Sequence, residues 1–162
     1  MHNVSVTRRI NKSGKDVWQI LDKFGDVYTY HPHVKHSQSI NELPTGPGAE
    51  RTCHFEDGNQ IKERIITYDS GNLYEVEIYD SGSFPLTKAI GRLHVIEIND
   101  NTSNVVFSMS FKPKFGPLGW VMAQLIMKNQ FKKILADVLR GLDRNLQTGD
   151  VTTRKNLKSK AA

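Results

Sequence analysis

The end of the chain contains a long amphipathic segment that limits the possible folds more than any other feature. From Pro117 to Leu146, apolar side chains recur at the three- and four-residue spacing of one helical face. Pro117 suits the first helical position, and Gly149 stands just past the expected end. At 1.5 Å per residue such a helix is about 45 Å long, so it must lie across a sheet. A helix across a curved antiparallel sheet can leave a hollow between the two layers, and this hollow is the main indication of function.

Composition indicates one domain. The chain has 162 residues, of which 38% are hydrophobic and 24% charged. No run approaches the ~20 apolar residues of a membrane span, and the opening MHNVSVTRRI lacks the apolar core of a signal peptide. A single cysteine, Cys53, excludes an internal disulfide and fits a reducing compartment. We therefore expect a cytoplasmic protein that does not insert stably into a membrane, as a monomer or a homodimer.

Much of the net charge of +5 falls in the last fifteen residues. Residues 148–162 carry four Lys or Arg side chains against one Asp, which is +3. The remaining charges are interspersed in sign, which is typical of a solvated surface and not of a nucleic-acid interface. Because the last segment is almost without apolar side chains, we expect a domain over residues 1–147 and a disordered basic tail over residues 148–162.

The residue pattern of the rest of the chain predicts mostly strands. We expect a strand at 3–10, a helix that begins near Lys15 with Ser13 as its cap, and a short helical turn that stops at His31-Pro32. Further strands are expected at 34–43, 49–56, 60–69, 72–80, 87–99 and 103–112, separated by short Gly-, Asn- and Asp-containing turns. Connections this short enforce antiparallel pairing, so the fold class is α+β.

Alternation predicts which side chains face the helix. A three-residue loop, Asp57-Gly58-Asn59, would pair Phe55 with Ile61, Cys53 with Glu63 and Arg51 with Ile65. A two-residue loop would turn the apolar side chains of one strand to the opposite face, so the first register is favoured. The same alternation along the later strands predicts that the inward residues are Tyr74, Val76, Ile78, Ala89, Gly91, Leu93, Val95, Val105, Phe107, Met109 and Phe111. The small Ala89 and Gly91 either let the helix approach closely or leave space.

Several motifs occur in order: Gly46-Pro47-Gly48-Ala49-Glu50-Arg51-Thr52, then Asp57-Gly58, then Ile61-Lys62-Glu63-Arg64-Ile65, followed by the long terminal helix. Together they resemble the polyketide cyclase/dehydrase branch of the START-like (SRPBCC) superfamily. The resemblance covers about residues 3 to 147. It implies a helix-grip fold, with a seven-stranded antiparallel curved sheet wrapped around the C-terminal helix and two short helices after the first strand. It also implies an apolar cavity for a hydrophobic small molecule, no metal or nucleotide cofactor, and a glutamate, matched by Glu63, that points into the cavity.

Glu63 is the most informative single residue. A carboxylate among Cys53, Phe55, Ile61 and Ile65 must pair with a cation or take a raised pKa, and Arg51 is the available cation. One interpretation is a polar anchor or general acid/base for a ligand. The other is a structural bridge between Glu63 and Arg51.

The remaining candidates for chemistry are weaker. His31, His33 and His36 lie in one loop without the Cys or carboxylate neighbours that a metal site needs, so we place them at a cavity rim or the surface. The alternation of inward and outward side chains predicts that His54 and His94 point outward. Cys53 is expected to be a buried apolar residue and not a nucleophile.

These observations leave three functional hypotheses. The first is the binding of a small hydrophobic ligand, a lipid, quinone or polyketide-like aromatic, with residues 29–34 and 81–86 as gates. The second is a cyclase or dehydratase with Glu63 as acid/base, and the third is a protein-interaction role for the exposed helix face or the tail. The predicted ligand-binding residues are Arg51, Cys53, Phe55, Ile61, Glu63, Ile65, Tyr74, Val76, Ile78, Ala89, Gly91, Leu93, Phe107, Met109, Phe111, Phe131 and Leu135.

Overall fold

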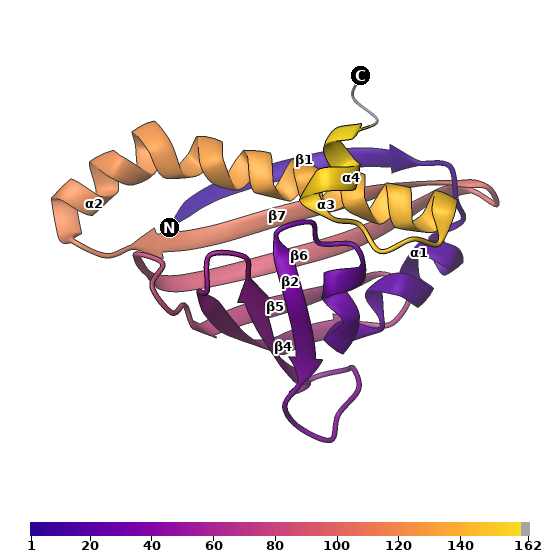
Figure 1. Ribbon diagram of the computed structural model, residues 1–162, viewed down its shortest axis with the longest axis horizontal. Coiled ribbons are helices and arrows are strands. Elements are labelled where there is room, and N and C mark those ends of the chain that lie inside the picture. The colour runs from indigo at the N-terminus through magenta and orange to yellow at the C-terminus, as the bar shows by residue number, and fades with distance from the viewer. Residues whose placement is uncertain (160–162) are drawn as a thin grey trace.

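Seven strands form one antiparallel sheet, and a long helix crosses one of its faces (Figure 1). The computed structural model describes residues 1–159. The strands are β1 (His2–Ile10), β2 (Val34–Ser39), β3 (Glu50–Phe55), β4 (Gln60–Asp69), β5 (Leu73–Asp80), β6 (Leu86–Asn99) and β7 (Thr102–Pro113). The helical elements are α1 (Gly14–Leu21), η1 (Phe24–Thr29), α2 (Gly116–Met122), η2 (Ala123–Met127), α3 (Lys128–Thr148) and α4 (Arg154–Ser159).

The strand order is β1-β7-β6-β5-β4-β3-β2. Strands β2 to β7 are joined as successive hairpins, and β1 completes the sheet by pairing with β7 from His2 opposite Phe111 to Ile10 opposite Ser103. Gly58 and Gly71 take positive φ angles of 84° and 82° in two of the turns, a conformation that favours glycine. The predicted helix-grip architecture is therefore confirmed.

Two short helical elements follow β1, as predicted. The Ser13 hydroxyl accepts a hydrogen bond from the Asp16 amide at 3.1 Å and so caps α1. Val17 and Leu21 bury the inner face of that helix. The 3₁₀ element η1 ends at Thr29, two residues before His31-Pro32, because the residue before a proline is disfavoured in the helical region.

The long helix is continuous but not uniform. Elements α2, η2 and α3 follow one another without a break, and η2 is a π-helical turn. Within α3 the buried side chains include Leu135, Val138, Leu139 and Leu142, which pack on the sheet. Gly149 ends the helix in the left-handed conformation at φ 75°. The expected helix is confirmed: it runs from Gly116 to Thr148, and the π-helical turn inside it is the feature that the periodicity did not indicate.

The predicted register between β3 and β4 is wrong by two residues. Arg51 pairs with Glu63 and Cys53 pairs with Ile61, because the loop consists of Glu56, Asp57 and Gly58. The Phe55 amide donates to the Asn59 carbonyl at 2.9 Å and closes this loop. A shift of two residues preserves the face of every side chain, so the inward set is correct although its partners were wrong.

The expectation of a disordered tail is also wrong for the described residues. After Gly149 the chain turns back, and the Thr152 amide donates to the Thr29 carbonyl at 2.8 Å. The Thr152 hydroxyl donates to the Gly141 carbonyl at 2.9 Å, and Leu157 of α4 is buried. Gly141 leaves room for the returning chain, because a Cβ at this position would meet the Tyr30 carbonyl. Residues 160–162 of the predicted tail lie outside the described residues.

Candidate functional site

A buried ion pair joins β3 and β4 on the inner face of the sheet. The Nε of Arg51 donates to Oε2 of Glu63 at 2.5 Å, and both side chains are at least about nine-tenths buried. The two residues lie directly opposite each other in the antiparallel ladder, so the pairing needs no distortion of the backbone. The pair of Arg51 and Glu63 is thus a local polar site on an otherwise apolar face, and we call it the polar focus.

Helical element η1 completes the environment of Arg51. Its Nη1 donates to the Phe24 carbonyl at 2.8 Å, and its guanidinium lies over the Phe24 ring at 4.0 Å from the centroid. Burial lowers the pKa of Arg51, but the neighbouring Glu63 and the other acidic groups around it outweigh that effect and raise the pKa above its ordinary value. Arg51 therefore stays charged and fixed.

Two tyrosines border the same polar focus. Tyr30 and Tyr74 are each about 1% exposed, and burial raises the pKa of both above the ordinary value. The Tyr74 hydroxyl lies beside that of Tyr30, and each influences the pKa of the other, but within residues 1–159 the Tyr74 hydroxyl makes no hydrogen bond of good geometry. A buried, unpaired hydroxyl is unfavourable in a folded protein unless something else satisfies it. A ligand in the interior would have to reach this buried hydroxyl for the group to donate to it.

Cys53 is next to the pair but is not a nucleophile. Its Sγ donates to Oε2 of Glu63 at 3.5 Å. Burial and then the negative charge of Glu63 raise the pKa of the thiol well above its ordinary range. The sequence prediction of an inert, buried Cys53 agrees with this geometry.

The histidines divide into two kinds. His31 packs its ring against Phe55, with centroids 6.3 Å apart, and burial, then His33 and Arg51, lower its pKa to about 3. His33 instead contacts Asp137 of α3 at 3.0 Å, and His36 is exposed and stacks on His54. Within residues 1–159 no three His, Cys, Asp or Glu side chains are grouped to hold a metal ion.

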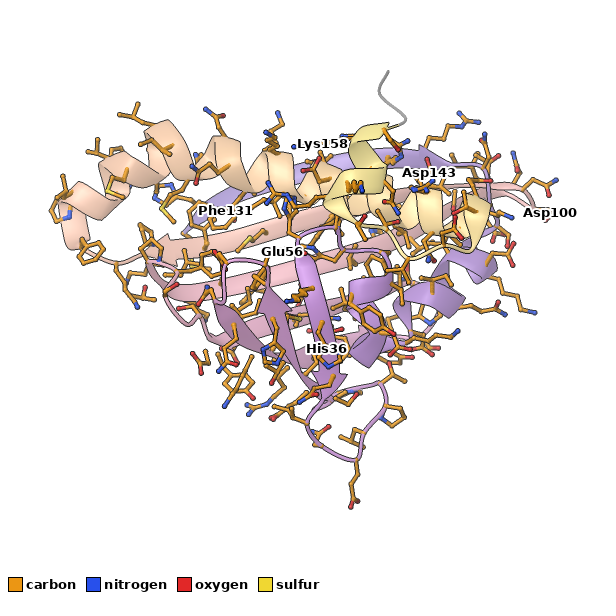
Figure 2. The ribbon with its side chains drawn as sticks, viewed as in Figure 1. His36, Glu56, Asp100, Phe131, Asp143 and Lys158 are labelled. Carbon is orange, nitrogen blue, oxygen red and sulfur yellow. The ribbon has the colours of Figure 1, made fainter. Side chains whose placement is uncertain are left out.

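The predicted ligand-binding residues lie in two neighbouring core clusters. The first cluster holds the residues around the ion pair and towards the middle of β6: Cys53, Ile61, Ile65, Tyr74, Val76 and Leu93. The second lies under the N-terminal half of the long helix and holds Ala89, Met109, Phe111 and Leu135. Phe131 packs on Phe111 with centroids 4.7 Å apart, and Figure 2 shows its side chain near the junction of helix and sheet. Arg51 and Glu63 border the first cluster and are the charged residues of this interior.

Between the two clusters, inward side chains keep part of their surface accessible. Phe55, Ile78, Gly91, Phe107 and Phe131 are only half-buried. Both Ile78 and Phe107 contact the two clusters at once. A Cβ built on Gly91 would meet only the Phe107 ring, at an ordinary contact distance of 3.5 Å. The inward residues that keep accessible surface thus include Gly91 of β6 and the Phe107 ring beside it.

The two predicted gate segments meet over Phe55. Phe84, in the segment between β5 and β6, packs edge-on against Phe55 with centroids 5.5 Å apart. His31, in the segment before β2, packs on Phe55 as well. Three rings from two loops and a strand end thus cover one edge of the inner face.

Two surface hollows border the long helix. One, of about 400 Å³, lies between the loop at Pro32 and helices α3 and α4, and is lined by His33, Asp137, Arg140 and Arg154 among others. The other, of about 660 Å³, lies beneath the start of α2 beside Met1, His2 and Phe115. None of the predicted ligand-binding residues lines either hollow.

Sequence reasoning missed Tyr30 and His31 as neighbours of the ion pair. Both precede a proline in a short irregular segment, where no periodicity indicates the direction of a side chain. The only available signal was the aromatic content of Tyr28, Tyr30 and His31. Tyr74 was correctly placed inward, but its unpaired hydroxyl cannot be read from a sequence.

Comparisons with known proteins agree with this architecture. The family model described as polyketide cyclase / dehydrase and lipid transport matches residues 1–147. No curated protein sequence shows significant similarity to the chain.

Among solved structures, the protein XoxI from Bacillus cereus is 24% identical with a TM-score of 0.75, and the match covers 91% of this chain and 97% of that one. A START superfamily protein from Mycobacterium smegmatis is 13% identical with a TM-score of 0.75, over 91% and 98% of the two chains. Norcoclaurine synthase from Thalictrum flavum, solved with dopamine and hydroxybenzaldehyde, is 15% identical with a TM-score of 0.68, over 90% and 86%. At these identities the likeness shows the fold alone.

Proposed function

The chain belongs to the polyketide cyclase/dehydrase and lipid transport family, and from this premise we propose that it binds a small hydrophobic molecule between the sheet and the long helix. The proposed ligand is a lipid, a quinone or a polyketide-like aromatic. The observation that carries the proposal is the polar focus on an apolar inner face, bordered by the unpaired Tyr74 hydroxyl. A site of this kind encloses the apolar part of a ligand and orients it through a few polar groups.

The half-buried inner residues supply the apolar contact surface. Phe55, Phe107 and Phe131 offer aromatic rings, and Gly91 adds no side chain of its own beside the Phe107 ring. Aromatic side chains bury large apolar areas and suit flat or extended ligands. The ligand would lie along β6 and β7 beneath the helix.

The polar focus would receive the ligand's carbonyl or hydroxyl group. The Tyr74 hydroxyl can donate, whereas Nε and Nη1 of Arg51 already donate to Glu63 and Phe24. Because the cation is held in place, its fixed charge would favour an electron-rich ligand atom. Phe84 and His31 would have to move off Phe55 for entry, and these ring contacts support the proposed gate role of residues 29–34 and 81–86.

Titration with a fatty acid and with a benzoquinone, followed by native mass spectrometry of gently purified protein, tests this proposal. We expect a one-to-one adduct for at least one of these probes. Gly91→Ile places a branched side chain against the Phe107 ring, in the proposed site, and should lower affinity by at least about tenfold. Ser108→Ile, on the outward face of β7, is the matched control and should leave affinity unchanged. A wild-type protein that binds neither probe class, or equal affinity in both variants, would contradict the proposal.

A second candidate is a cyclase or dehydratase, and the Tyr74 hydroxyl is the observation that favours it. Such chemistry needs a second proton-transfer group beside Glu63, and Tyr74 supplies one near the ion pair. With a polyketide-like substrate, Glu63→Gln should abolish turnover while binding is retained. Turnover that survives this change would remove Glu63 from the mechanism.

A further inference from the structure

The N-terminal end of the long helix exposes large apolar side chains to solvent. Phe115, Leu118 and Leu125 are each 67–69% exposed, a degree typical of polar surface residues. We call this surface the apolar tip, and it consists of Phe115, Leu118, Trp120, Val121, Met122, Leu125 and Ile126. A contiguous patch of this kind on a monomer marks an interaction site.

The apolar tip is the face of the helix opposite the sheet. Leu118, Val121, Met122, Leu125 and Ile126 follow the three- and four-residue spacing of one face. The inner face is lined by Gly119, Ala123 and Met127, which are buried. Figure 1 shows α2 extending past the end of the sheet, with its outer side free. A helix that is apolar on both faces needs a second apolar environment.

Phe115 projects from a strained turn at the base of the tip. It has φ 72°, and it is the only non-glycine residue within the described chain with a positive φ. The left-handed conformation is unfavourable for a bulky side chain. This conformation places the aromatic ring in solvent, where the residue is 67% exposed. Burial of the ring in an apolar phase would offset the unfavourable backbone conformation.

The segment of the chain that carries the tip has charges of a single sign. Between Asp100 and Asp137 the sequence contains no acidic residue and has Lys112, Lys114, Lys128, Lys132 and Lys133. Asp100 itself lies on the β6–β7 hairpin at the far end of the molecule from α2 (Figures 1 and 2). No lysine in residues 1–159 forms an ion pair. Exposed apolar side chains with unpaired lysines on both sides are complementary to an anionic interface.

We propose that the apolar tip docks on the surface of a phospholipid bilayer that contains anionic lipids. Leu118, Val121, Leu125 and Phe115 enter the boundary between headgroups and acyl chains, and the lysines contact lipid phosphates. The helix stays in the plane of the interface, because no helix in residues 1–159 is long and apolar enough to cross a membrane. This surface function goes beyond ligand binding in the interior and does not depend on it.

Charge favours the bilayer over a second copy of the chain. Two tips packed face to face would bring both sets of lysines together without an acid between Asp100 and Asp137 to neutralise them. A bilayer with anionic headgroups neutralises the same lysines. Salt should therefore weaken docking, because the electrostatic part of the attraction is screened.

The fluorescence emission of Trp120 reports docking directly. The chain has two tryptophans, and the other, Trp18, is buried with an Nε1 that donates no hydrogen bond. In a Trp18→Phe background, Trp120 at 56% exposure is the sole indole. Its emission should shift to shorter wavelength with vesicles of phosphatidylcholine and about one-third phosphatidylglycerol, and much less with phosphatidylcholine alone.

Co-sedimentation of the full chain with the same vesicles measures the affinity. Leu118→Asp with Leu125→Asp should lower vesicle partitioning at least about tenfold, and Lys128→Glu with Lys132→Glu should lower it at least about threefold. The matched control is Ile40→Asp with Leu43→Asp, on the exposed loop between β2 and β3 away from the helix. This control should bind like the wild type, and circular dichroism checks that every variant is folded.

Three results would overturn the proposal. They are a wild-type protein that binds neither vesicle, an Asp variant of the tip that binds as well as the wild type, and a wild-type dimer that becomes monomeric in the tip variant without any vesicle binding. The fatty-acid and quinone titrations on the tip variant keep the two proposals separate. Loss of vesicle binding with unchanged ligand affinity supports the bilayer proposal alone, and the converse supports interior binding alone.

Discussion

Arg51 and Glu63 form a directly cross-strand ion pair, with Nε and Oε2 2.5 Å apart, in the interior of the sheet. The pair is enclosed by the Phe24 ring and carbonyl on one side and by Cys53 on the other. Two charges in this position are stable only together, since either one alone would be buried without a partner. This dependence gives the first prediction.

Glu63→Leu should lower the free energy of unfolding by about 3–5 kcal/mol, because it leaves the Arg51 guanidinium buried and unpaired. The double variant Arg51→Met with Glu63→Leu should recover most of that loss, since it removes both charges. Urea denaturation of Glu63→Leu, Arg51→Met, the double variant and the wild type measures the difference. A double variant as unstable as the sum of its single changes would show that the pair is not coupled.

Tyr74→Phe should leave stability unchanged or raise it by up to about 1 kcal/mol, because the hydroxyl that it removes has no hydrogen bond. The same change should weaken binding of a quinone or fatty acid if the hydroxyl contacts the ligand. Tyr68→Phe is the control, since the Tyr68 hydroxyl donates to Asp22 at 2.7 Å and its loss should destabilise the protein. Ligand affinity equal to that of the wild type in Tyr74→Phe would remove this hydroxyl from the site.

Stability should fall as the pH is lowered from 6.5 towards 3, in part because of His31. Burial, with His33 and Arg51, lowers the pKa of folded His31 to about 3, whereas the unfolded value is near 6.5. Below pH 6.5 the unfolded chain binds a proton that the folded chain does not, so stability declines with slope up to about 1.4 kcal/mol per pH unit. His31→Gln should flatten this decline, and His94→Gln should not. Equal slopes in both variants between pH 6 and 4 would contradict the assignment.

The sequence predicted the fold well because its signals are local. Strand ends coincide with turn residues, and the helix periodicity from Pro117 onwards is nearly unbroken. The pairing of β3 with β4 was wrong because alternation determines a face but not a register, and both candidate partners of Arg51 point inward. The position of His31 depends on tertiary packing against Phe55, which no local pattern records.

The C-terminal segment shows a second limit of sequence reasoning. A segment with few apolar residues was expected to be disordered, yet Thr152 and Leu157 are buried. Order here comes from hydrogen bonds that join Thr152 to Thr29 and Gly141. The presence of such long-range partners cannot be inferred from composition.

Leu157→Ala should therefore destabilise the protein by about 1–3 kcal/mol, since it removes a buried side chain from the contact between α4 and α3. Val151→Ala, at a position that is 46% exposed, should change stability by less than about 0.5 kcal/mol. Thermal and urea unfolding test both. A Leu157→Ala variant as stable as the wild type would favour the original expectation of a tail that does not contribute to the fold.

Gly141→Ala should destabilise the protein although alanine is the better helix former. A Cβ at this position would collide with the Tyr30 carbonyl and contact Pro32 and Thr152. The overlap is with backbone, so it forces α3 away from the loop and should cost about 1–3 kcal/mol. Asn129→Ala, on the exposed face of the same helix, should instead stabilise by a few tenths of a kcal/mol. A gain in melting temperature for Gly141→Ala would contradict the close approach.

The π-helical turn at Ala123–Met127 sets the direction in which the end of the long helix faces. Such a turn holds one residue more than an α-helical turn, and one residue corresponds to a rotation of about 100°. Removing a single residue such as Gln124 would restore a regular helix and swing Leu118 and Val121 round by that angle relative to α3. The extra residue of this turn therefore decides which side chains of α2 face the sheet and which face outward.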